Sequence, residues 1–435
     1  MQVEYFRERP ELPRLLTAAR LQSLRQRRKP RVHSWSPCIS EIPRRVQPES
    51  NSAVHASGRH GQQAGMINPE KARIRTLDGW RAIAILFVLA DHATHFTALA
   101  NHLPGNLGSF GVDVFFVISG YIITARFLEE RKRNSTINLG SFYVRRVFRI
   151  LPLVIAYLST ICLLSLFLKL IYFHPSEIMG ALFFFRNYQA DARLDTIFTI
   201  HFWSLSIEEH FYLLWPAPLL FLGNRRALYL AIASAVFCGF WRIHLTCNPY
   251  NETARAQLGA AMARHVWRTD ARFDGLMMGC AAAILLSYPA VRSFILRNFP
   301  KELPLILAAF LTLNLTATDF WPTSATYVLI TLMLASSLVV EEGLAYKVLN
   351  LRILAWIGTI SYSVYIWQEL FMVRPDKDDL PLGALSAFPL NLIAVIAVSA
   401  LSFYFIERPC TSFGKRMARK WCERSSAGRA DLITH

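Results

Sequence analysis

The chain has few charged residues for its length, which argues against a set of soluble domains. Only 18% of the 435 residues are charged, whereas 53% are hydrophobic and 13% are aromatic. A chain of this size could form two or three soluble domains. Repeated apolar runs combined with sparse charge are instead typical of a protein that crosses a membrane several times.

Cysteine is also scarce, and its placement indicates no cross-linking or metal chemistry. The chain has seven cysteines, of which Cys162, Cys238 and Cys280 lie in apolar runs, and no C-x-x-C pair occurs. Neither a disulfide framework nor a zinc site is indicated by this pattern. We therefore expect no bound metal.

Residues 1–65 lack the continuous apolar core that a signal peptide requires. They are rich in arginine, proline, serine and glutamine, with a basic cluster from Arg25 to Arg31. We expect a basic, disordered N-terminal extension, and contact with a partner or an anionic lipid surface is the alternative. Met66 precedes a short polar lead into the first apolar run. It is the expected translation start, which would leave residues 1–65 untranslated.

The formal net charge of +17 has a simple explanation in a membrane protein. Lysine and arginine gather on the cytoplasmic loops of such proteins, so the excess does not require nucleic acid. We expect the lipid bilayer, and no nucleic acid, as a partner.

Ten apolar runs follow Met66, and a helical span needs about 20 apolar residues. The sequence therefore predicts an all-α, polytopic membrane protein with about ten transmembrane helices. The runs cover 80–98, 110–127, 150–172, 203–222, 227–245, 274–288, 303–316, 324–340, 353–372 and 385–406.

The placement of lysine and arginine sets the expected orientation. With the N-terminus inside, most of these residues fall on cytoplasmic connections, and 246–273 is the one arginine-rich outer loop. Both termini are thus predicted to be cytoplasmic. We expect a membrane domain over 66–409, in which Pro409 ends the last span, and a basic cytoplasmic tail over 410–435.

Ionisable residues occur where the first apolar run should be uniformly hydrophobic. Asp78, Arg81, Asp91 and His92 lie at or inside it. A charge at the bilayer centre costs about 2.5–3.5 kcal/mol on insertion scales, so such residues usually have a function. Arg81 and His92 are separated by about 16 Å along a helix, which places Arg81 near the cytoplasmic face and His92 beyond the midplane. Three more carboxylates are expected on the outer side: Asp113, Glu208 and Asp274.

Seven motifs in a fixed order give the chain a family resemblance. They are TLDGWRAIAILFVLADH, FGVDVFFVISGYIIT, FYVRRVFRILP, HFWSLSIEEHFYLLWP, RFDGLMMG, IGTISYSVYIWQ and FYFIERP. From Thr76 to Pro409 the sequence resembles the acyltransferase-3 family of bacterial integral membrane O-acyltransferases. The resemblance implies transfer of an acyl group, usually acetyl, from cytoplasmic acyl-CoA to a hydroxyl. The acceptor would be an envelope or secreted glycan, such as lipopolysaccharide or another polysaccharide, a small glycoside or a lipid.

The resemblance implies a location in the bacterial inner membrane. It also implies that acyl-CoA is the donor substrate and not a permanently bound cofactor.

Esterification of an alcohol by a thioester needs a base and a group that stabilises the developing oxyanion. His92 is the expected base, because imidazole titrates near neutrality and Arg81 and His92 match the R-x10-H signature of the family. A histidine hydrogen-bonded between helices is the alternative. Glu208 is the expected catalytic partner of His92, and a carboxylate paired with arginine for packing is its alternative.

The motif R-R-x-x-R is the expected binding site for the phosphates of the donor. Arg145, Arg146 and Arg149 are spaced i,i+3 and i,i+4, and guanidinium groups suit phosphate oxygens. A basic stretch that only sets orientation is the alternative. Arg81 and Asp113 are further candidates for substrate binding, and Asp113 could equally pair with an arginine.

Other residues have expected structural roles. Asp78 with Arg81, and Arg272 with Asp274, are expected to form ion pairs near the site. Gly120 and Gly279 are expected to permit close helix approach. Gln368 stands where the family often has histidine, and an amide cannot exchange protons.

Direct attack by the acceptor hydroxyl is the first mechanism, since no strongly placed cysteine or serine favours an acyl-enzyme. The rival function is a transporter or flippase for a glycan or lipid precursor, although the sequence has no inverted repeat. The oligomeric state, the acyl group and the acceptor are not predicted.

Overall fold

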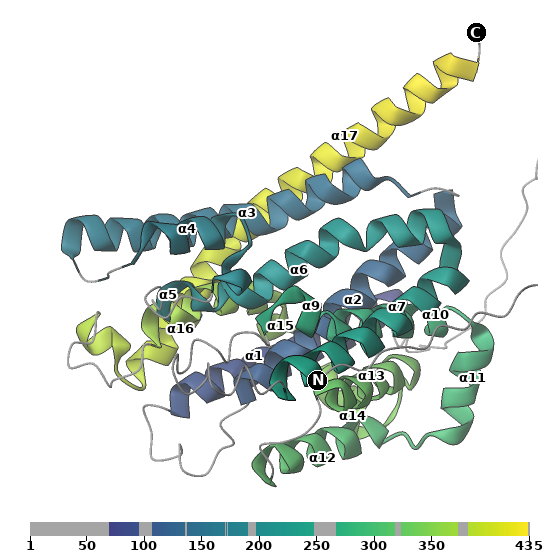
Figure 1. Ribbon diagram of the computed structural model, residues 1–435, viewed down its shortest axis with the longest axis horizontal. Helices are drawn as coiled ribbons and strands as arrows, with labels where there is room; N and C mark the ends of the chain where they lie inside the picture. The colour runs from purple at the N-terminus through teal and green to yellow at the C-terminus, as the bar shows by residue number, and fades with distance from the viewer. Residues whose placement is uncertain are drawn as a thin grey trace, which may run out of the picture. The chain divides into compact units, whose positions relative to one another are not determined.

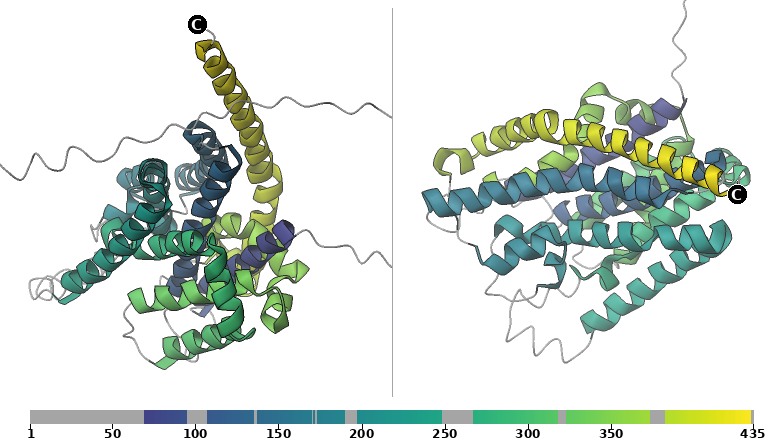
Figure 2. Two further views of the ribbon diagram at one scale, coloured as in Figure 1. Left: turned by 90° about the vertical axis from the view of Figure 1, so that its right-hand side faces the viewer. Right: turned by 90° about the horizontal axis from the view of Figure 1, so that it is seen from above.

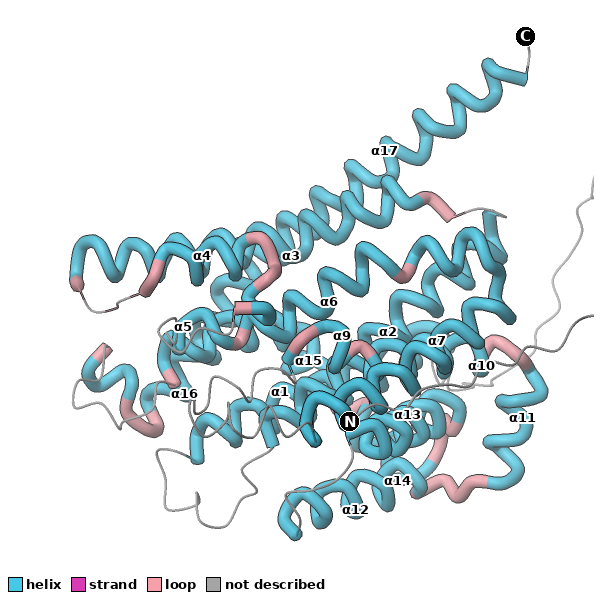
Figure 3. The backbone as a smooth tube through the Cα atoms, in the orientation of Figure 1, coloured by secondary structure: helices cyan, strands magenta, loops and turns pink. Residues whose placement is uncertain are grey.

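The computed structural model describes most of the chain from residue 69 onward (Figure 1). The described residues are 69–94, 107–134, 137–169, 171, 173–189, 197–247, 267–317, 323–372 and 382–433. The expected extension over 1–65 and the expected start at Met66 lie outside them. Within these ranges every regular element is helical and no strand occurs (Figure 3).

The longer α-helices alternate with short helical pieces. The α-helices are α1 (Pro69–Thr94), α2 (Leu107–Asn134), α3 (Leu139–Leu163), α4 (Pro175–Leu182), α5 (Ile197–Ile200), α6 (Phe202–Leu214), α7 (Pro216–Cys247), α9 (Thr269–Arg272), α10 (Asp274–Leu286), α11 (Pro289–Asn298), α12 (Leu303–Ala317), α13 (Thr323–Val339), α14 (Gly343–Leu349), α15 (Arg352–Phe371), α16 (Leu390–Ser402) and α17 (Arg408–Ile433). Two π-helical turns, Leu164–Leu168 and Phe403–Glu407, extend α3 and join α16 to α17, and Arg186–Tyr188 and Gly383–Ser386 are 3-10 turns.

Four helical stretches in the described part are long and apolar enough to cross a membrane, namely Leu107–Asn134, Leu139–Phe167, Pro216–Leu245 and Leu390–Glu423. Two helix pairs bent by 98° and 91° raise the number to six if each pair is one span: α10 with α11, and most of α13 with α14. The expected ten spans are therefore not confirmed. One reason is that α1 carries charged residues and that α6 and α10 have only 13 residues each.

Glycine permits close packing at the centre of the helix assembly, where α2 contacts α10 and α1, and α1 in turn contacts α15. A Cβ added at Gly120 of α2 would meet the Leu276 carbonyl oxygen at 2.0 Å. One added at Gly279 of α10 would meet the Val117 carbonyl oxygen at 2.1 Å. The two backbones touch only because both side chains are absent, as expected from the sequence.

The end of the last apolar run differs from the prediction. Helix α17 continues past Pro409 instead of ending there, and it lies beside α3 (Figures 1 and 2). The π-helical turn over Phe403–Glu407 runs on into α17, so Pro409 lies within one continuous helical stretch, Leu390–Glu423.

A second break falls between two of the expected spans. Gly223 interrupts α7 with φ 74° and ψ 168°, which are not helical values. Glycine adopts positive φ without the steric cost that a side chain brings. The break lies where the sequence predicted a connection between 203–222 and 227–245.

Candidate active site

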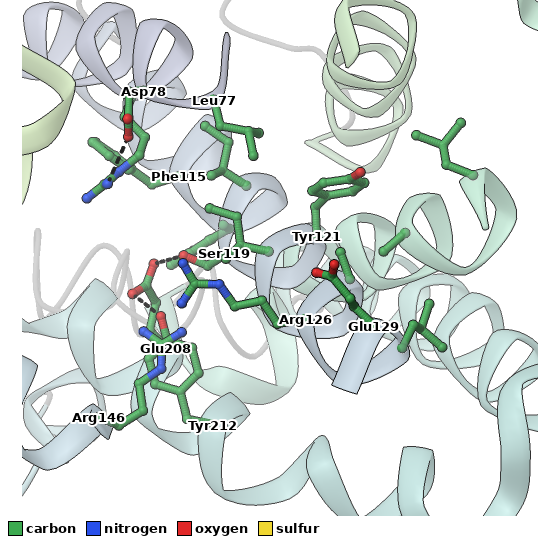
Figure 4. Close-up of a pocket in the computed structure, with 18 of the residues that line it drawn as sticks. Leu77, Asp78, Phe115, Ser119, Tyr121, Arg126, Glu129, Arg146, Glu208 and Tyr212 are labelled. Atoms are coloured by element: carbon green, nitrogen blue, oxygen red, sulfur yellow. Dashed lines mark hydrogen bonds and ion pairs between the residues drawn. The ribbon is translucent and has the colours of Figure 1, made fainter. Parts of the chain in front are cut away.

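A cavity of about 1550 Å³ is lined by residues of eight helices of the described part. The helices are α1, α2, α3, α6, α7, α10, α11 and α15. Figure 4 shows the wall formed by residues of α1, α2, α3 and α6. Ligand pockets usually measure about 300–1,000 Å³. This cavity therefore has room for a large or elongated ligand.

The lining of the cavity is strongly cationic. Eight lysine or arginine side chains face four carboxylates, those of Asp78, Glu129, Glu208 and Glu341. The cations are Arg81, Arg126, Arg131, Lys132, Arg133, Arg146, Arg149 and Arg292. Such a lining favours an anionic ligand, and guanidinium groups suit phosphate oxygens best.

Helix α2 contributes a polar stripe to the wall. Ser119, Arg126 and Arg133 are spaced by seven residues, or about two turns, so they share one face of the helix. Figure 4 shows the Arg126 guanidinium directed toward Ser119 and the Glu208 carboxylate. Our sequence analysis missed Arg126, although the seven-residue spacing of polar residues in an apolar run was a usable signal.

Helix α3 contributes two of the three arginines of the R-R-x-x-R motif. Arg146 and Arg149 line the cavity, and the Arg146 guanidinium carbon lies 4.3 Å from the centre of the Tyr212 ring. Arg145 does not line it, contrary to the expected single cluster. Its guanidinium pairs with Glu130 of α2 at 3.8 Å, because consecutive helical residues point about 100° apart.

Two carboxylates of the cavity wall are bonded to neighbouring side chains. Asp78 pairs with Arg81 of α1 at 3.4 Å, which confirms the expected ion pair. Glu208 of α6 accepts hydrogen bonds from the hydroxyls of Ser119 at 2.8 Å and Tyr212 at 2.9 Å (Figure 4). Glu208 thus joins α2 to α6 at the wall.

His92 has a different carboxylate partner from the one expected. Its Nε2 lies 3.0 Å from Oε1 of Glu369 on α15, and its Nδ1 lies 2.8 Å from the Val88 carbonyl oxygen. Glu208 is instead hydrogen-bonded to Ser119 and Tyr212, so its expected role as catalytic partner of His92 stays a prediction. Our sequence analysis missed Glu369, although a carboxylate inside the apolar run 353–372, directly after the motif IGTISYSVYIWQ, was a usable signal.

The cavity and the His92 pair are connected through α15. Tyr365 lines the cavity, and its hydroxyl hydrogen-bonds Ser204 at 2.5 Å and the His201 carbonyl oxygen at 2.9 Å. Glu369 follows Tyr365 by four residues, so the two side chains lie on the same face of the helix. A residue of the cavity wall, Tyr365, is thus one turn of α15 from the carboxylate that contacts His92.

A second polar cluster corrects one expected pairing. Arg272 lies 3.2 Å from Asp113 of α2 instead of pairing with Asp274, and the Tyr327 hydroxyl donates to Asp113 at 2.7 Å. Asp274 pairs with Arg242 of α7 at 2.5 Å. Asp113 is 5% exposed and does not line the cavity, so the structure shows its arginine-paired alternative.

Two remaining features of the sequence are Gln368 and the distribution of possible metal ligands. Gln368 is buried, and its Oε1 has no hydrogen-bond partner among the described residues. Across those same residues, no group of three histidine, cysteine or acidic side chains is arranged to hold a metal ion.

Comparison with known proteins identifies the family. A family model described as an acyltransferase domain matches residues 74–407. The chain is 27% identical over 370 residues to the putative peptidoglycan O-acetyltransferase YrhL of Bacillus subtilis, covering 78% of this chain and 55% of that one. It is 26% identical over 375 residues to the peptidoglycan O-acetyltransferase OatA of Listeria monocytogenes, covering 78% and 56%.

The O-acetyltransferase OatA of Staphylococcus aureus is 29% identical over 366 residues, with 78% of this chain and 57% of that one covered. The chain thus spans little more than half the length of these relatives. No solved structure matches it significantly. Because the family match covers most of the chain, including His92 and the whole of α2, the chain belongs to the acyltransferase family that this domain defines.

Proposed function

We propose that the protein is a membrane O-acyltransferase that moves an acetyl group from acetyl-CoA to a hydroxyl of an envelope glycan. The observation that carries the proposal is the arginine-lined cavity of about 1550 Å³, whose lining residue Tyr365 lies one turn of α15 from Glu369, the carboxylate that contacts His92. The names of the relatives, which are peptidoglycan O-acetyltransferases, support a glycan as the acceptor.

The donor lies in the cavity with its phosphates on the arginines of α2 and α3. Arg126, Arg146 and Arg149 supply guanidinium groups from two helices, which suits the several phosphate oxygens of CoA. The pantetheine arm passes the wall formed by Ser119, Glu208 and Tyr212. It brings the thioester toward Ser204 and Tyr365.

The reaction is a direct transfer in which His92 is the base. The imidazole takes the proton of the acceptor hydroxyl as the oxygen attacks the thioester carbon. The new C–O bond forms, the C–S bond breaks, and the proton passes from the imidazolium to the departing thiolate, which leaves as CoA-SH.

For the membrane topology the proposal keeps what the sequence predicts. In it, the chain crosses a bacterial inner membrane about ten times with both termini in the cytoplasm. Arg131, Lys132 and Arg133 line the cavity, and their basic character puts them on the cytoplasmic side in this topology, so the cavity is open to cytoplasmic acyl-CoA. His92 lies farther along α1, where the acceptor enters from the outer side.

The test compares envelope and secreted glycans by mass spectrometry in host cells that lack the gene and carry either wild type or His92→Ala. We expect a base-labile acetyl mass that returns only with the wild type at matched membrane levels. Restoration by His92→Ala would exclude His92 as the base. A change in glycan export with no change in acetyl mass would favour a transporter instead.

A further inference from the structure

Both ring nitrogens of His92 face hydrogen-bond acceptors. Nδ1 lies 2.8 Å from the Val88 carbonyl oxygen, which only accepts, and Nε2 lies 3.0 Å from a carboxylate oxygen of Glu369. A neutral imidazole carries one N–H and therefore satisfies one of these acceptors. Since Nδ1–H must donate to Val88, the contact at Nε2 requires one more proton.

With that extra proton on the imidazole, the pair is an imidazolium facing a carboxylate. When Nε2 loses it, a nitrogen lone pair faces the negative oxygen of Glu369 and the attraction becomes repulsion. The contact therefore closes only when His92 is protonated, and it opens when Nε2 is free to accept a proton. Glu369 thus stabilises the imidazolium form of His92, which is the form produced when His92 takes a proton.

The exposed fractions of the two side chains agree with His92 as the proton acceptor and Glu369 as the carboxylate that stabilises it. The His92 side chain is 24% exposed, whereas the Glu369 side chain is 5% exposed. The imidazole can thus be reached by another molecule, while the carboxylate lies behind it on a separate helix. Glu369 is fixed on α15, which packs along α1.

We propose that Glu369 is the positioning residue for His92: its carboxylate aims Nε2 and stabilises the imidazolium formed when His92 takes the proton of the acceptor hydroxyl. This role rests on the proposed acyl transfer, in which the proton moves from the hydroxyl to Nε2 and then to the CoA thiolate. Glu369 keeps its charge throughout and forms no bond with the substrate.

The first measurement does not depend on activity. Protein labelled with ¹⁵N-histidine is examined by NMR in lipid nanodiscs over a range of pH, with His92→Gln to assign the His92 signals. We expect Nε2 of His92 to keep its proton to a higher pH in the wild type than in Glu369→Gln, because the carboxylate stabilises the imidazolium. Loss of the Nε2 proton at the same pH in both proteins would overturn the proposal.

The second measurement follows release of CoA thiol from acetyl-CoA with soluble peptidoglycan fragments as acceptor. Glu369→Gln should lower kcat about 100-fold or more, as expected for loss of acid–base function, while KM for acetyl-CoA changes less than about threefold. In a His92→Ala background the same change should give no further loss. Glu369→Asp, which keeps the charge, should retain more activity than Glu369→Gln.

Glu423→Gln, an exposed carboxylate on α17, is the matched control and should stay within about twofold of the wild type. An unchanged kcat in folded Glu369→Gln contradicts the positioning role alone. A wild type that releases no thiol contradicts the proposed function, and the NMR result then still decides whether Glu369 holds a protonated His92.

Discussion

Tyr365 precedes Glu369 by one turn of α15, so a residue of the cavity wall and the partner of His92 share one helix face. The donor cavity and the histidine are therefore linked by a rigid element, not by a loop. This linkage makes it possible to separate variants that weaken donor binding from variants that slow the chemistry.

Adjacent arginines of the R-R-x-x-R motif should behave differently. Arg146→Ala should weaken binding of CoA about 10-fold or more, because a hydrogen bond to a charged group contributes about 1.5–3 kcal/mol. Arg145→Ala should change it less than about threefold, since Arg145 pairs with Glu130 outside the cavity. Isothermal titration of the purified protein with CoA measures both, and equal losses would contradict the assignment.

Arg126 should contribute to donor binding although it lies outside every motif we recognised. Arg126→Ala should raise the Kd for CoA about 10-fold and make binding less sensitive to salt, because one cation leaves the cavity. Arg297→Ala is the matched control, since Arg297 is exposed on α11 and does not line the cavity. A Kd for Arg126→Ala within twofold of the control would exclude contact between Arg126 and the donor.

Replacing Glu208 should mainly change KM for acetyl-CoA, whereas replacing Glu369 should mainly lower kcat. Glu208→Gln keeps one oxygen acceptor for Ser119 or Tyr212 but alters the charge of the cavity wall. We expect KM for acetyl-CoA to change severalfold while kcat stays within about threefold. A loss of kcat as large as that of Glu369→Gln would return Glu208 to the role expected from the sequence.

The ion pair between Asp113 and Arg272 should contribute to the stability of the protein and not to catalysis. Removing one partner of a buried ion pair typically costs about 3–5 kcal/mol, so Asp113→Asn and Arg272→Gln should each lower the thermal midpoint of the protein in nanodiscs. The double variant should lose less than the sum of the two, because no charge is then left unpaired. Acetyl transfer per folded molecule should persist, and a selective rise in KM for the glycan would instead show that Asp113 binds the acceptor.

Close packing of α2 on α10 should tolerate no side chain at Gly279. Gly279→Val places a branched carbon against the Val117 carbonyl oxygen and should cost about 1–3 kcal/mol. Leu285→Ala, at a 38% exposed position on the same helix, should have a smaller effect on the thermal midpoint. Equal midpoints for the two variants would mean that the helices do not need this contact.

The amino-acid sequence by itself determined the class of the protein and the kinds of residue in its site. Apolar runs predicted an all-helical membrane protein, and ionisable residues within them marked His92, Arg81 and Glu208 as unusual. The glycines that permit helix approach and the Asp78–Arg81 pair were also predicted correctly. These are local properties, since hydropathy, helical period and i,i+3 spacing are read within one segment.

Only the tertiary structure decided which residue partners which. His92 and Glu369 are 277 residues apart, and Asp113 and Arg272 are 159 residues apart, so no local period relates them. Arg145 and Arg146 are neighbours in sequence, yet only Arg146 lines the cavity. The rotation of each helix about its axis and the choice of its neighbours depend on how all the helices pack together, and the sequence of one helix does not specify them.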